Sequence, residues 1–243
     1  MPRHALDYVP TDLGPFDIDP AKPMARQLYE AVRDKILTMH LKPGDAVSEI
    51  DLANATGSSR SPARQAIKQL VLEHLLISFP SRGTFVAPLD LGRLNDALFI
   101  RAQLEPEIAA RCATAPGNSA TLEALGEIVS QQRKALEKGK DKQAEALDGA
   151  FHFTLCGAQE DSLVWRVLRD ARAEAQRLHA LSKVRDKSME IALTHHEAIL
   201  SALRSGDGEV AAAAMTAHMA DNKRALEQII QTFPDYFVTE STT

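Results

Sequence analysis

The sequence has few of the residues on which several classes of protein depend. Among its 243 residues there are two cysteines and one tryptophan, and only 5% of the side chains are aromatic. Cys112 and Cys156 lack the spacing of a thiolate metal motif, so we interpret both as small core residues in a reducing cytoplasm. No apolar run approaches the ~18 residues of a membrane span, and residues 1–20 lack the apolar core of a secretion signal. We therefore expect a cytoplasmic protein with no membrane partner.

The chain as a whole also lacks the positive charge that binding to nucleic acid often requires. It has 28 Lys and Arg residues against 33 Asp and Glu residues, which gives a formal net charge of -5. Only residues 22–90 carry a positive excess, with nine basic against seven acidic side chains. This local excess is a weak indication of nucleic-acid binding. The frequent Ala, Leu, Glu, Arg and Gln residues favour helices.

Turn and capping residues divide the N-terminal third of the chain into short helices. Apolar residues at helical spacing predict a helix over residues 23–39, and a Pro-Gly dipeptide marks the turn after it. Ser48 is a plausible N-cap for a short helix over residues 49–56. Gly57 is a natural residue for the end of that helix.

The next predicted helix has one apolar face and one polar, partly basic face. Ser61 and Pro62 supply an N-cap and a first-turn proline, and the helix should run to about Glu73. Arginine, lysine and glutamine on the polar face can contact phosphates or base edges in the major groove of DNA. Any solvated helix face has such residues, so this face alone does not establish DNA binding. The apolar face comprises Ala63, Ile67, Leu70 and Val71, and the polar face comprises Arg64, Gln65, Lys68 and Gln69.

Two short segments rich in β-forming residues follow this helix and predict a small hairpin. Gly83 allows the hairpin turn to take a positive φ, and Arg82 at its tip can reach a flanking groove or the DNA backbone. A helix, a short helix, an amphipathic helix and a basic hairpin, in this order, make a winged helix-turn-helix. The candidate DNA-contacting residues are Ser59, Arg60, Arg64, Gln65, Lys68, Arg82 and Gly83.

Several motifs in this region resemble those of one family of regulators. The motifs are PGD (43–45), SE..LA (48–53), SR.P.R.A (59–66), the L..E.L rhythm (70–75) and RGTFV (82–86). They are similar to the N-terminal DNA-binding domain of GntR-type bacterial transcription regulators, over roughly residues 23–88. The family usually has a glycine after the last glutamate of its recognition helix, whereas this chain has His74. Histidine tolerates a positive φ better than most residues, so we expect a strained but intact helix end.

The rest of the chain has only helical signals, which predict a compact antiparallel bundle of about six helices. The expected fold is therefore mainly α, with an N-terminal winged helix-turn-helix, a small β-hairpin wing and this C-terminal bundle. The candidate helices of the bundle are 90–114, 119–138, 140–159, 161–185, 188–205 and 207–232. We expect a mobile arm over 1–21, the winged helix over 22–88, the bundle over 89–235 and a disordered tail over 236–243. The bundle is expected to bind the metal and the effector and to form the dimer.

Three histidines and one aspartate on the predicted helices could converge in the core of the bundle. Asp148 and His152 are four residues apart and share one helix face. His196 leads the inward apolar face of its helix, and His218 lies near the middle of the last helix. Imidazole nitrogen and carboxylate oxygen suit a divalent transition metal, zinc first, with nickel, manganese or iron as alternatives. Such spacing also arises by chance, and each histidine could be an ordinary hydrogen-bonded core or surface residue.

The bundle motifs also resemble a known domain. The motifs are R..LEPEIAA (101–110), D..FH (148–152), H.AIL.AL..GD...A (196–211) and A...M..HM (211–219). They are similar to the helical ligand-binding (FCD) domain in the FadR-like branch of GntR-type regulators. The resemblance implies that Asp148, His152, His196 and His218 bind a divalent metal. It favours His196 over the adjacent His195 as the ligand.

The resemblance further implies a site for a small effector beside the metal. An arginine of the R..LE motif, here Arg101, would hold the effector's carboxylate, because a guanidinium can bind a carboxylate through two hydrogen bonds. The alternative is that Arg101 forms a surface ion pair with Glu105, four residues later. Asn222, one turn after His218, is a weaker candidate for the same pocket.

Together these patterns predict a DNA-binding transcription regulator and not an enzyme. A homodimer would place two winged helices on a pseudo-palindromic operator in double-stranded DNA, and a carboxylate at the metal would shift the arrangement of the two DNA-binding domains. The resemblance implies a repressor of a catabolic or transport operon. One alternative is a metalloenzyme acting on a small organic acid, which lacks a convincing general base and leaves the winged helix unexplained. Another is a DNA binder with a purely structural metal.

Overall fold

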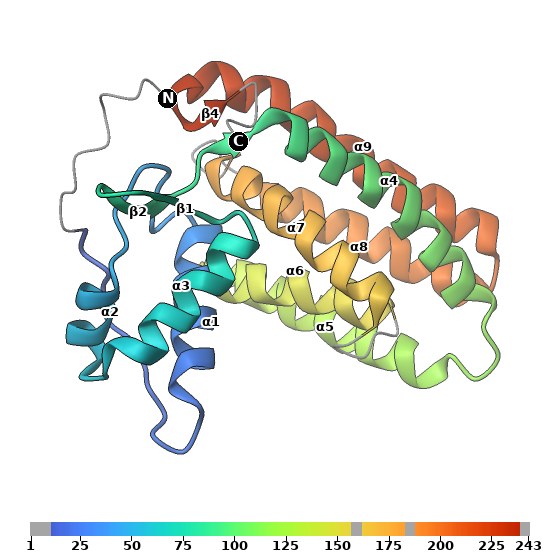
Figure 1. Cartoon of the computed structure of the whole chain (residues 1–243). Helices are drawn as coiled ribbons and strands as arrows, with labels where there is room; N and C mark the ends of the chain where they lie inside the picture. The colour runs from blue at the N-terminus through green and yellow to red at the C-terminus, as the bar shows by residue number, and fades with distance from the viewer. Residues whose placement is uncertain (1–10, 157–161, 183–187, 239–243) are drawn as a thin grey trace. The chain divides into compact units, whose positions relative to one another are not determined.

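The structure is a computed structural model that describes residues 11–156, 162–182 and 188–238 (Figure 1). Within these ranges the side chains of residues 179, 182, 188 and 222–228 are outside the description. The chain forms two compact units, one of residues 1–93 with 232–243 and the other of residues 94–231. In the described part of the chain, no helix is both long and apolar enough to cross a membrane.

The first unit is the expected winged helix-turn-helix. Helices α1 and α3 pack together through their apolar faces, and β1 pairs with β2 as an antiparallel hairpin in which Phe79 lies opposite Gly83. The short strands β3 and β4 pair in parallel. The bounds are α1 (Met24–Leu37), α2 (Glu49–Thr56), α3 (Arg60–Leu72), β1 (Leu76–Phe79), β2 (Gly83–Val86), β3 (Leu89–Asp90) and β4 (Phe237–Val238).

The capping residues explain where these helices begin and end. Ser48 caps α2 by accepting a hydrogen bond from the backbone N–H of Asp51 at 3.0 Å, and Gly57 ends it in the left-handed conformation, with φ of +63°. His74 has a φ of +57°, as its position after the recognition helix predicted. The N–H of Leu75 then bonds to the carbonyl of Leu70 at 2.9 Å, which closes the end of α3.

The expected start of α3 is wrong by two residues. Ser59, not Ser61, is the N-cap, and the helix begins at Arg60. Pro62 is therefore the third residue of the helix and not its first. This position is tolerated because the N–H groups of the first turn have no acceptor within the helix.

Both ends of the chain make contacts with the first unit where they are described. Leu13 is buried, and the Thr11 hydroxyl accepts a hydrogen bond from the backbone N–H of Ala46 at 3.1 Å. The ammonium of Lys35 lies 5.1 Å from the centre of the Phe16 ring. Thr11, Leu13 and Phe16 thus contact the first unit although a mobile arm was expected over 1–21, and residues 1–10 lie outside the described part. Likewise β4 falls within the segment where a disordered tail was expected.

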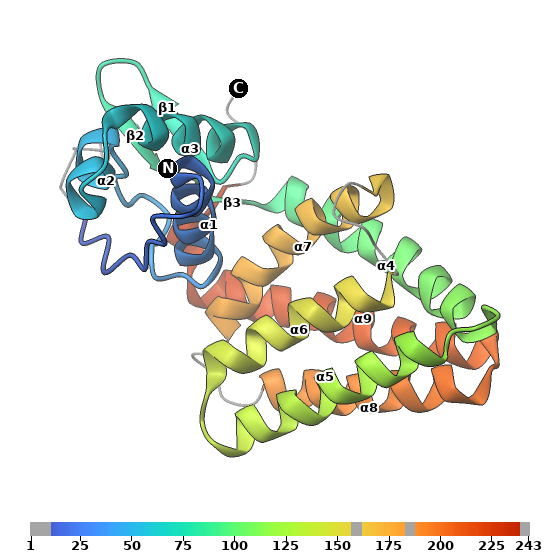
Figure 2. The ribbon, with the colours of Figure 1, turned by 90° about the horizontal axis from the view of Figure 1, so that it is seen from below.

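The described residues of the second unit form a bundle of six helices, in the order that the sequence predicts. Figure 2 shows how these helices lie beside one another. Helix α5 packs against α6 and α8, and α6 also contacts α8. One apolar cluster of described residues draws side chains from α4, α5, α6, α8 and α9, among them Leu125, Val129, Phe151, Ile199 and Met215. The bounds are α4 (Leu91–Thr114), α5 (Ser119–Glu137), α6 (Asp141–Leu155), α7 (Leu163–Ser182), α8 (Ser188–Ser205) and α9 (Gly208–Thr232).

Candidate DNA-binding surface and metal centre

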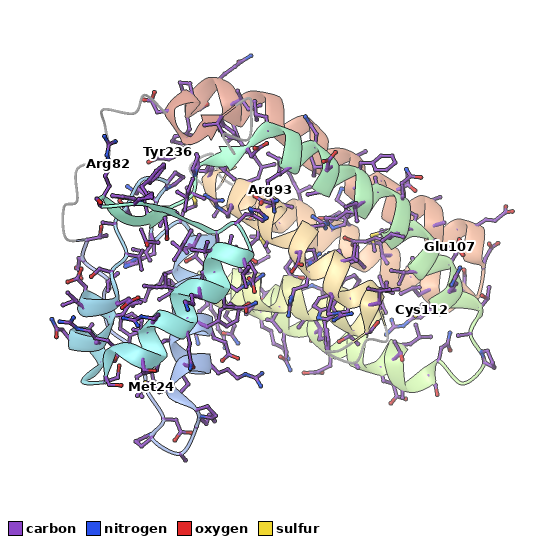
Figure 3. The ribbon with its side chains drawn as sticks, viewed as in Figure 1. Met24, Arg82, Arg93, Glu107, Cys112 and Tyr236 are labelled. Atoms are coloured by element: carbon purple, nitrogen blue, oxygen red, sulfur yellow. The ribbon has the colours of Figure 1, made fainter. Side chains whose placement is uncertain are left out.

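The polar face of α3 is exposed over its full length. Ala63, Ala66, Ile67 and Leu70 are buried against the rest of the unit, so the residues between them face outward. The wing is also exposed: Figure 3 shows Arg82 at the turn between β1 and β2, and Gly83 has a φ of +114°. All the predicted DNA-contacting residues lie on the surface, namely Ser59, Arg60, Arg64, Gln65, Lys68, Arg82 and Gly83.

A carboxylate on α2 contacts this face, and the sequence patterns did not single it out. Glu49 accepts hydrogen bonds from Arg64, one from Nε at 2.9 Å and one from Nη2 at 3.0 Å. These hydrogen bonds, with smaller contributions from the charges of Arg60 and Lys68, lower the pKa of Glu49 below its ordinary value. Glu49 lies in the SE..LA motif, but a pair that spans 15 residues and two helices leaves no periodic signal.

Three histidines meet in the core of the bundle. His152 of α6, His196 of α8 and His218 of α9 are all buried, and their candidate ligand nitrogens lie within 4.8 Å of one another. The centres of the three rings are 5.2 to 5.3 Å apart in each pair. Sequence periodicity could place each histidine on a helix face, and the fold brings the three faces together.

The chemistry of these nitrogens fits a metal ion. Burial lowers the pKa of His196 to about 3, and burial followed by the charge of Arg172 lowers that of His152. The imidazoles are therefore neutral, which is the form that binds metal. Nε2 of His152 and Nε2 of His196 are buried without a hydrogen-bond partner among the described residues. Because buried polar atoms are normally satisfied, two such atoms pointing into one cluster indicate a site for a cation.

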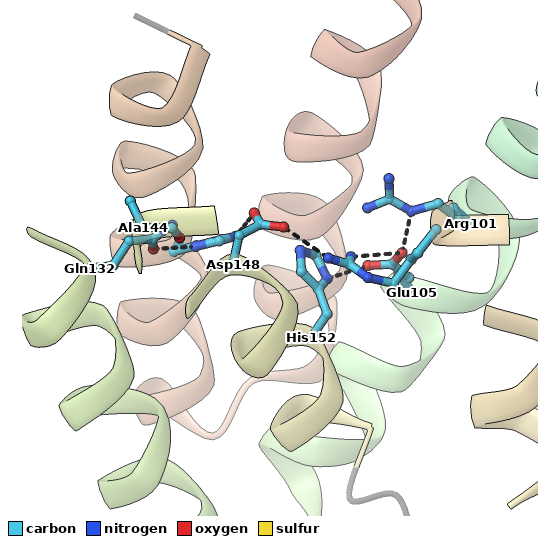
Figure 4. A network of polar contacts seen from close by, with 8 residues as sticks. Arg101, Glu105, Gln132, Ala144, Asp148 and His152 are labelled. Atoms are coloured by element: carbon cyan, nitrogen blue, oxygen red, sulfur yellow. Dashed lines mark hydrogen bonds and ion pairs between the residues drawn. The ribbon is translucent and has the colours of Figure 1, made fainter. Parts of the chain in front are cut away.

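A glutamine fixes the orientation of His196. Nδ1 of His196 lies 2.8 Å from Oε1 of Gln132, and the Gln132 amide nitrogen donates to the carbonyl oxygen of Ala144 at 3.3 Å (Figure 4). Since that amide oxygen can only accept, Nδ1 carries the proton and Nε2 keeps its lone pair toward the cluster. Oδ1 of Asp148 lies 3.5 Å from this Nε2.

A carboxylate has the equivalent role for His152. Nδ1 of His152 lies 2.5 Å from Oε2 of Glu105, an arrangement that leaves Nε2 facing the cluster. The other oxygen of Glu105 accepts a hydrogen bond from Nε of Arg101 at 2.6 Å, and Nη1 of Arg172 is 3.9 Å away. Burial alone would raise the pKa of Glu105, but the charges of Arg101 and Arg172 and the hydrogen bond from His152 hold it well below its usual range.

Asp148 lies at the edge of the histidine cluster and is held by an arginine. Its Oδ2 accepts a hydrogen bond from Nη2 of Arg172 at 2.8 Å, while its Oδ1 faces His196. Burial of the carboxylate would raise its pKa, but the charge of Arg172 lowers it far below its ordinary value. Asp148 is therefore ionised and oriented, with one oxygen directed toward the histidines.

The remaining predicted residues of this site fall in three different situations. Arg101 does pair with Glu105, but the expectation of a surface pair is wrong because both side chains are buried. His195 lies beside the cluster, with Nε2 2.6 Å from Oδ2 of Asp221, so the fold places His196 and not His195 among the three histidines. Asn222 is on α9, but its side chain lies outside the described part of the chain.

The sequence patterns did not indicate the three residues that orient this cluster. Glu105 belongs to the R..LE motif and was visible there only as a partner for Arg101. Arg172 lies on α7 and Gln132 on α5, two helices in which no motif was found. Arg172 contacts Asp148 of α6, and Gln132 contacts His196 of α8. An internal charge or amide on a mainly apolar helix face is the only signal that could have indicated them.

Comparison with known proteins identifies both units. Residues 24–86 match the family described as bacterial regulatory proteins, gntR family, and residues 96–221 match the FCD domain. The HTH-type transcriptional repressor RspR of Escherichia coli strain K12 is 29% identical over 223 residues, which cover 92% of this chain and 97% of RspR. An uncharacterised HTH-type transcriptional regulator from an unstable DNA locus of Streptomyces ambofaciens is 30% identical over 218 residues, or 90% of this chain and 91% of that protein.

A solved structure shows the same fold. Escherichia coli McbR/YncC superimposes with a TM-score of 0.73 over 87% of this chain and 99% of its own, at 19% sequence identity. The relatives are regulators of transcription and not enzymes, and the FCD match covers more than half of the chain. The chain therefore belongs to the gntR family of bacterial transcription regulators, with an FCD domain as its C-terminal part.

Proposed function

We propose that this regulator is a repressor whose affinity for its operator is controlled by a small carboxylate bound at a divalent metal in the FCD domain. The observation that supports this most strongly is the convergence of three buried, neutral histidines, two of which have an unpartnered Nε2 among the described residues. A core of this kind has no structural need for three imidazoles, because apolar residues of the same volume would fill it without leaving polar atoms unsatisfied.

The metal would be held by His152, His196 and His218, with Asp148 as a further ligand. Three imidazoles and a carboxylate suit zinc first, with nickel, manganese or iron as alternatives. When bound, the ion supplies a cation to which a carboxylate oxygen of the effector can bind. Gln132 and Glu105 keep the two neighbouring imidazoles in the tautomer that ligation requires.

The effector would be a small carboxylate because two guanidinium groups lie beside the histidines. Arg101 is buried and uses its Nε to bind Glu105. Arg172 uses Nη2 to bind Asp148, and its Nη1 is buried without a hydrogen-bond partner in the described part of the chain. A guanidinium and a cation acting together can hold two oxygens of one carboxylate. Asn222 remains a further candidate for this pocket.

Control of DNA binding would follow from a shift between conformations of a homodimer. Two copies of the winged helix would contact two halves of a pseudo-palindromic operator. An effector that binds one arrangement of the DNA-binding domains more tightly favours that arrangement and changes the affinity for DNA. The name of RspR as a repressor supports repression, and the family resemblance favours a catabolic or transport operon as the target.

Metal analysis of the purified full-length protein is the first test. We expect about one divalent ion per chain, and in a thermal-shift screen of mono- and dicarboxylic acids at least one acid that raises the Tm of the metal-loaded protein only. The same acid should then weaken binding to the operator. Protein without metal that responds to no acid would contradict the proposal. A purely structural metal would instead give a bundle that unfolds on chelation and an operator affinity that no acid changes.

A further inference from the structure

One carboxylate lies within a surface that is otherwise suited to phosphate. Glu49 is close enough to Arg60, Arg64 and Lys68 for all three charges to lower its pKa. A negative charge at this position opposes attraction to the DNA backbone, which is a general and sequence-independent contribution to binding. Phosphate binding therefore does not explain why Glu49 lies within this surface.

The geometry of the pair determines which part of Arg64 is left for a ligand. Glu49 engages the side edge of the guanidinium, formed by Nε and Nη2. Among the described residues, the end edge, formed by Nη1 and the second hydrogen of Nη2, makes no hydrogen bond. Two parallel N–H donors on this end edge match the O6 and N7 acceptors of guanine in the major groove, which is the commonest specific arginine contact with DNA.

We propose that Glu49 is a positioning residue for base recognition, which holds Arg64 so that its end edge reads a guanine and not a phosphate. This inference rests on the proposed DNA-binding function. Glu49 comes from α2 and Arg64 from α3, so the pair couples the two helices of the helix-turn-helix at the surface that meets the DNA. Each half of a symmetric operator would contain one guanine read in this way.

Stability does not account for the pair. The Arg64 side chain is 58% exposed and the Glu49 side chain 32% exposed, and ion pairs at such positions contribute little to folding. Helices α2 and α3 are already joined by buried apolar residues, including Leu52 and Ala63. An orienting contact limits the rotamers of a long side chain before DNA arrives, which favours a directional base contact over a diffuse contact with phosphate.

Selection from a library of randomised DNA duplexes with the full-length protein tests the proposal. The proteins to compare are the wild type, Glu49→Gln, Glu49→Ala, Arg64→Ala and the control Glu30→Ala. Glu30 is matched because it is also an exposed carboxylate, on α1, that accepts a hydrogen bond from an arginine, Arg26, at 2.7 Å. Binding of each protein to a mixed-sequence duplex at several salt concentrations gives the non-specific affinity.

We expect the wild type to select a motif with a guanine that Arg64→Ala no longer prefers. Both Glu49 variants should reduce the preference for guanine at that same base pair about tenfold, since a bidentate contact discriminates by roughly this factor or more. Their affinity for the mixed-sequence duplex should be unchanged or higher, because a negative charge has been removed. Glu30→Ala should select the wild-type motif.

The outcomes separate this inference from the proposed function. A wild-type protein that selects no motif would contradict DNA recognition itself. A wild-type motif whose guanine depends on Arg64 but persists in both Glu49 variants would overturn the role of Glu49 and leave DNA recognition intact, as would a motif in which Arg64→Ala changes no guanine. Glu49→Gln keeps the shape of the side chain, so it gives the decisive result if Glu49→Ala has a lowered Tm.

Discussion

Each unit has an arginine–glutamate pair at its candidate site, and these two pairs lie in opposite environments. In the winged helix the side chains of Arg64 and Glu49 are 58% and 32% exposed, whereas in the bundle those of Arg101 and Glu105 are 4% and 3% exposed. An exposed pair changes the free energy of folding little whether it is formed or broken, so its role can be to orient a side chain. A buried pair is costly to desolvate and far more costly to leave with one partner.

This difference indicates what each surface is built to receive. The polar face of α3 keeps its charges in water, where the large anionic ligand supplies most of the electrostatic energy when it binds. The bundle buries Arg101, Glu105 and three neutral histidines, and it holds the partly exposed Asp148 and Arg172 beside them. A small cation and a small anion would therefore find ligand atoms and hydrogen-bond donors that are already oriented. A preorganised polar site of this kind has to be stabilised by the surrounding core.

The largest effect on stability is expected when Glu105 of the buried pair is replaced. Glu105→Ala leaves the buried Arg101 without its hydrogen-bond acceptor and should destabilise the bundle by about 3–5 kcal/mol. Unfolding of the metal-free protein in urea can be followed by the fluorescence of Trp165, the single tryptophan of the chain, which lies on α7. A loss below about 1 kcal/mol would mean that the buried pair is no more important than an exposed one.

The same helix supplies a matched control for this variant. Glu107 accepts a hydrogen bond from Arg111 at 2.8 Å with the same four-residue spacing, but both side chains are largely exposed. Glu107→Ala should change the free energy of unfolding by no more than about 0.5 kcal/mol. Equal losses in Glu105→Ala and Glu107→Ala would break the comparison between buried and exposed pairs.

A smaller effect is expected from the glutamine that orients His196. Gln132→Ala removes the acceptor of the Nδ1 proton, so metal affinity should fall about 10- to 100-fold while the stoichiometry at excess metal stays the same. Competition with a chromogenic chelator measures this affinity. Gln131→Ala is the control, because Gln131 is exposed on the same helix and donates a hydrogen bond to Glu127 at 2.8 Å. If both variants bind metal as the wild type does, Gln132 has no role at the site.

The fold was largely predictable because its signals are local. Apolar spacing and the caps at Ser48 and Gly57 indicated the helices that the structure contains, and the six-helix order of the bundle agrees as well. The error at Ser61 arose because three serines precede or enter α3, and only the backbone decides which of them caps it. The packing of Leu13 was missed because one buried residue has no periodicity.

The candidate site was predictable only in part, for a different physical reason. The histidines of the cluster have sequence neighbours at helical spacing, and a resemblance could point to them. Gln132 meets His196 across 64 residues, and Arg172 meets Asp148 across 24. Such contacts depend on how helices pack and not on any pattern along one helix. Orienting residues therefore emerge from the structure, while the residues they orient can be found in the sequence.

The smallest predicted effect concerns a pair of intermediate burial, between the exposed and buried extremes. Glu73 at the end of α3 accepts hydrogen bonds from the Tyr29 hydroxyl at 2.7 Å and from Nε of Arg33 at 3.2 Å, both on α1. Burial would raise the pKa of Glu73, but the hydrogen bonds from Tyr29 and Gln69 and the charge of Arg33 lower it below its ordinary value. The ionised carboxylate therefore stabilises the contact between α1 and α3.

The sign of the pH dependence follows from that direction. Because the folded pKa of Glu73 is depressed, its contribution is complete above the unfolded pKa of about 4.3 and is lost as the pH falls through the folded pKa. Glu73→Gln should cost about 1 kcal/mol at pH 7, and the difference from the wild type should shrink below pH 4. Hydrogen exchange of peptides from α1 and α3, corrected for intrinsic rates, measures this in the first unit alone. Glu30→Gln changes an exposed carboxylate on α1 and should show no such difference. If the difference in stability between Glu73→Gln and the wild type stayed constant at acid pH, the charge of Glu73 would not be what holds α3 to α1.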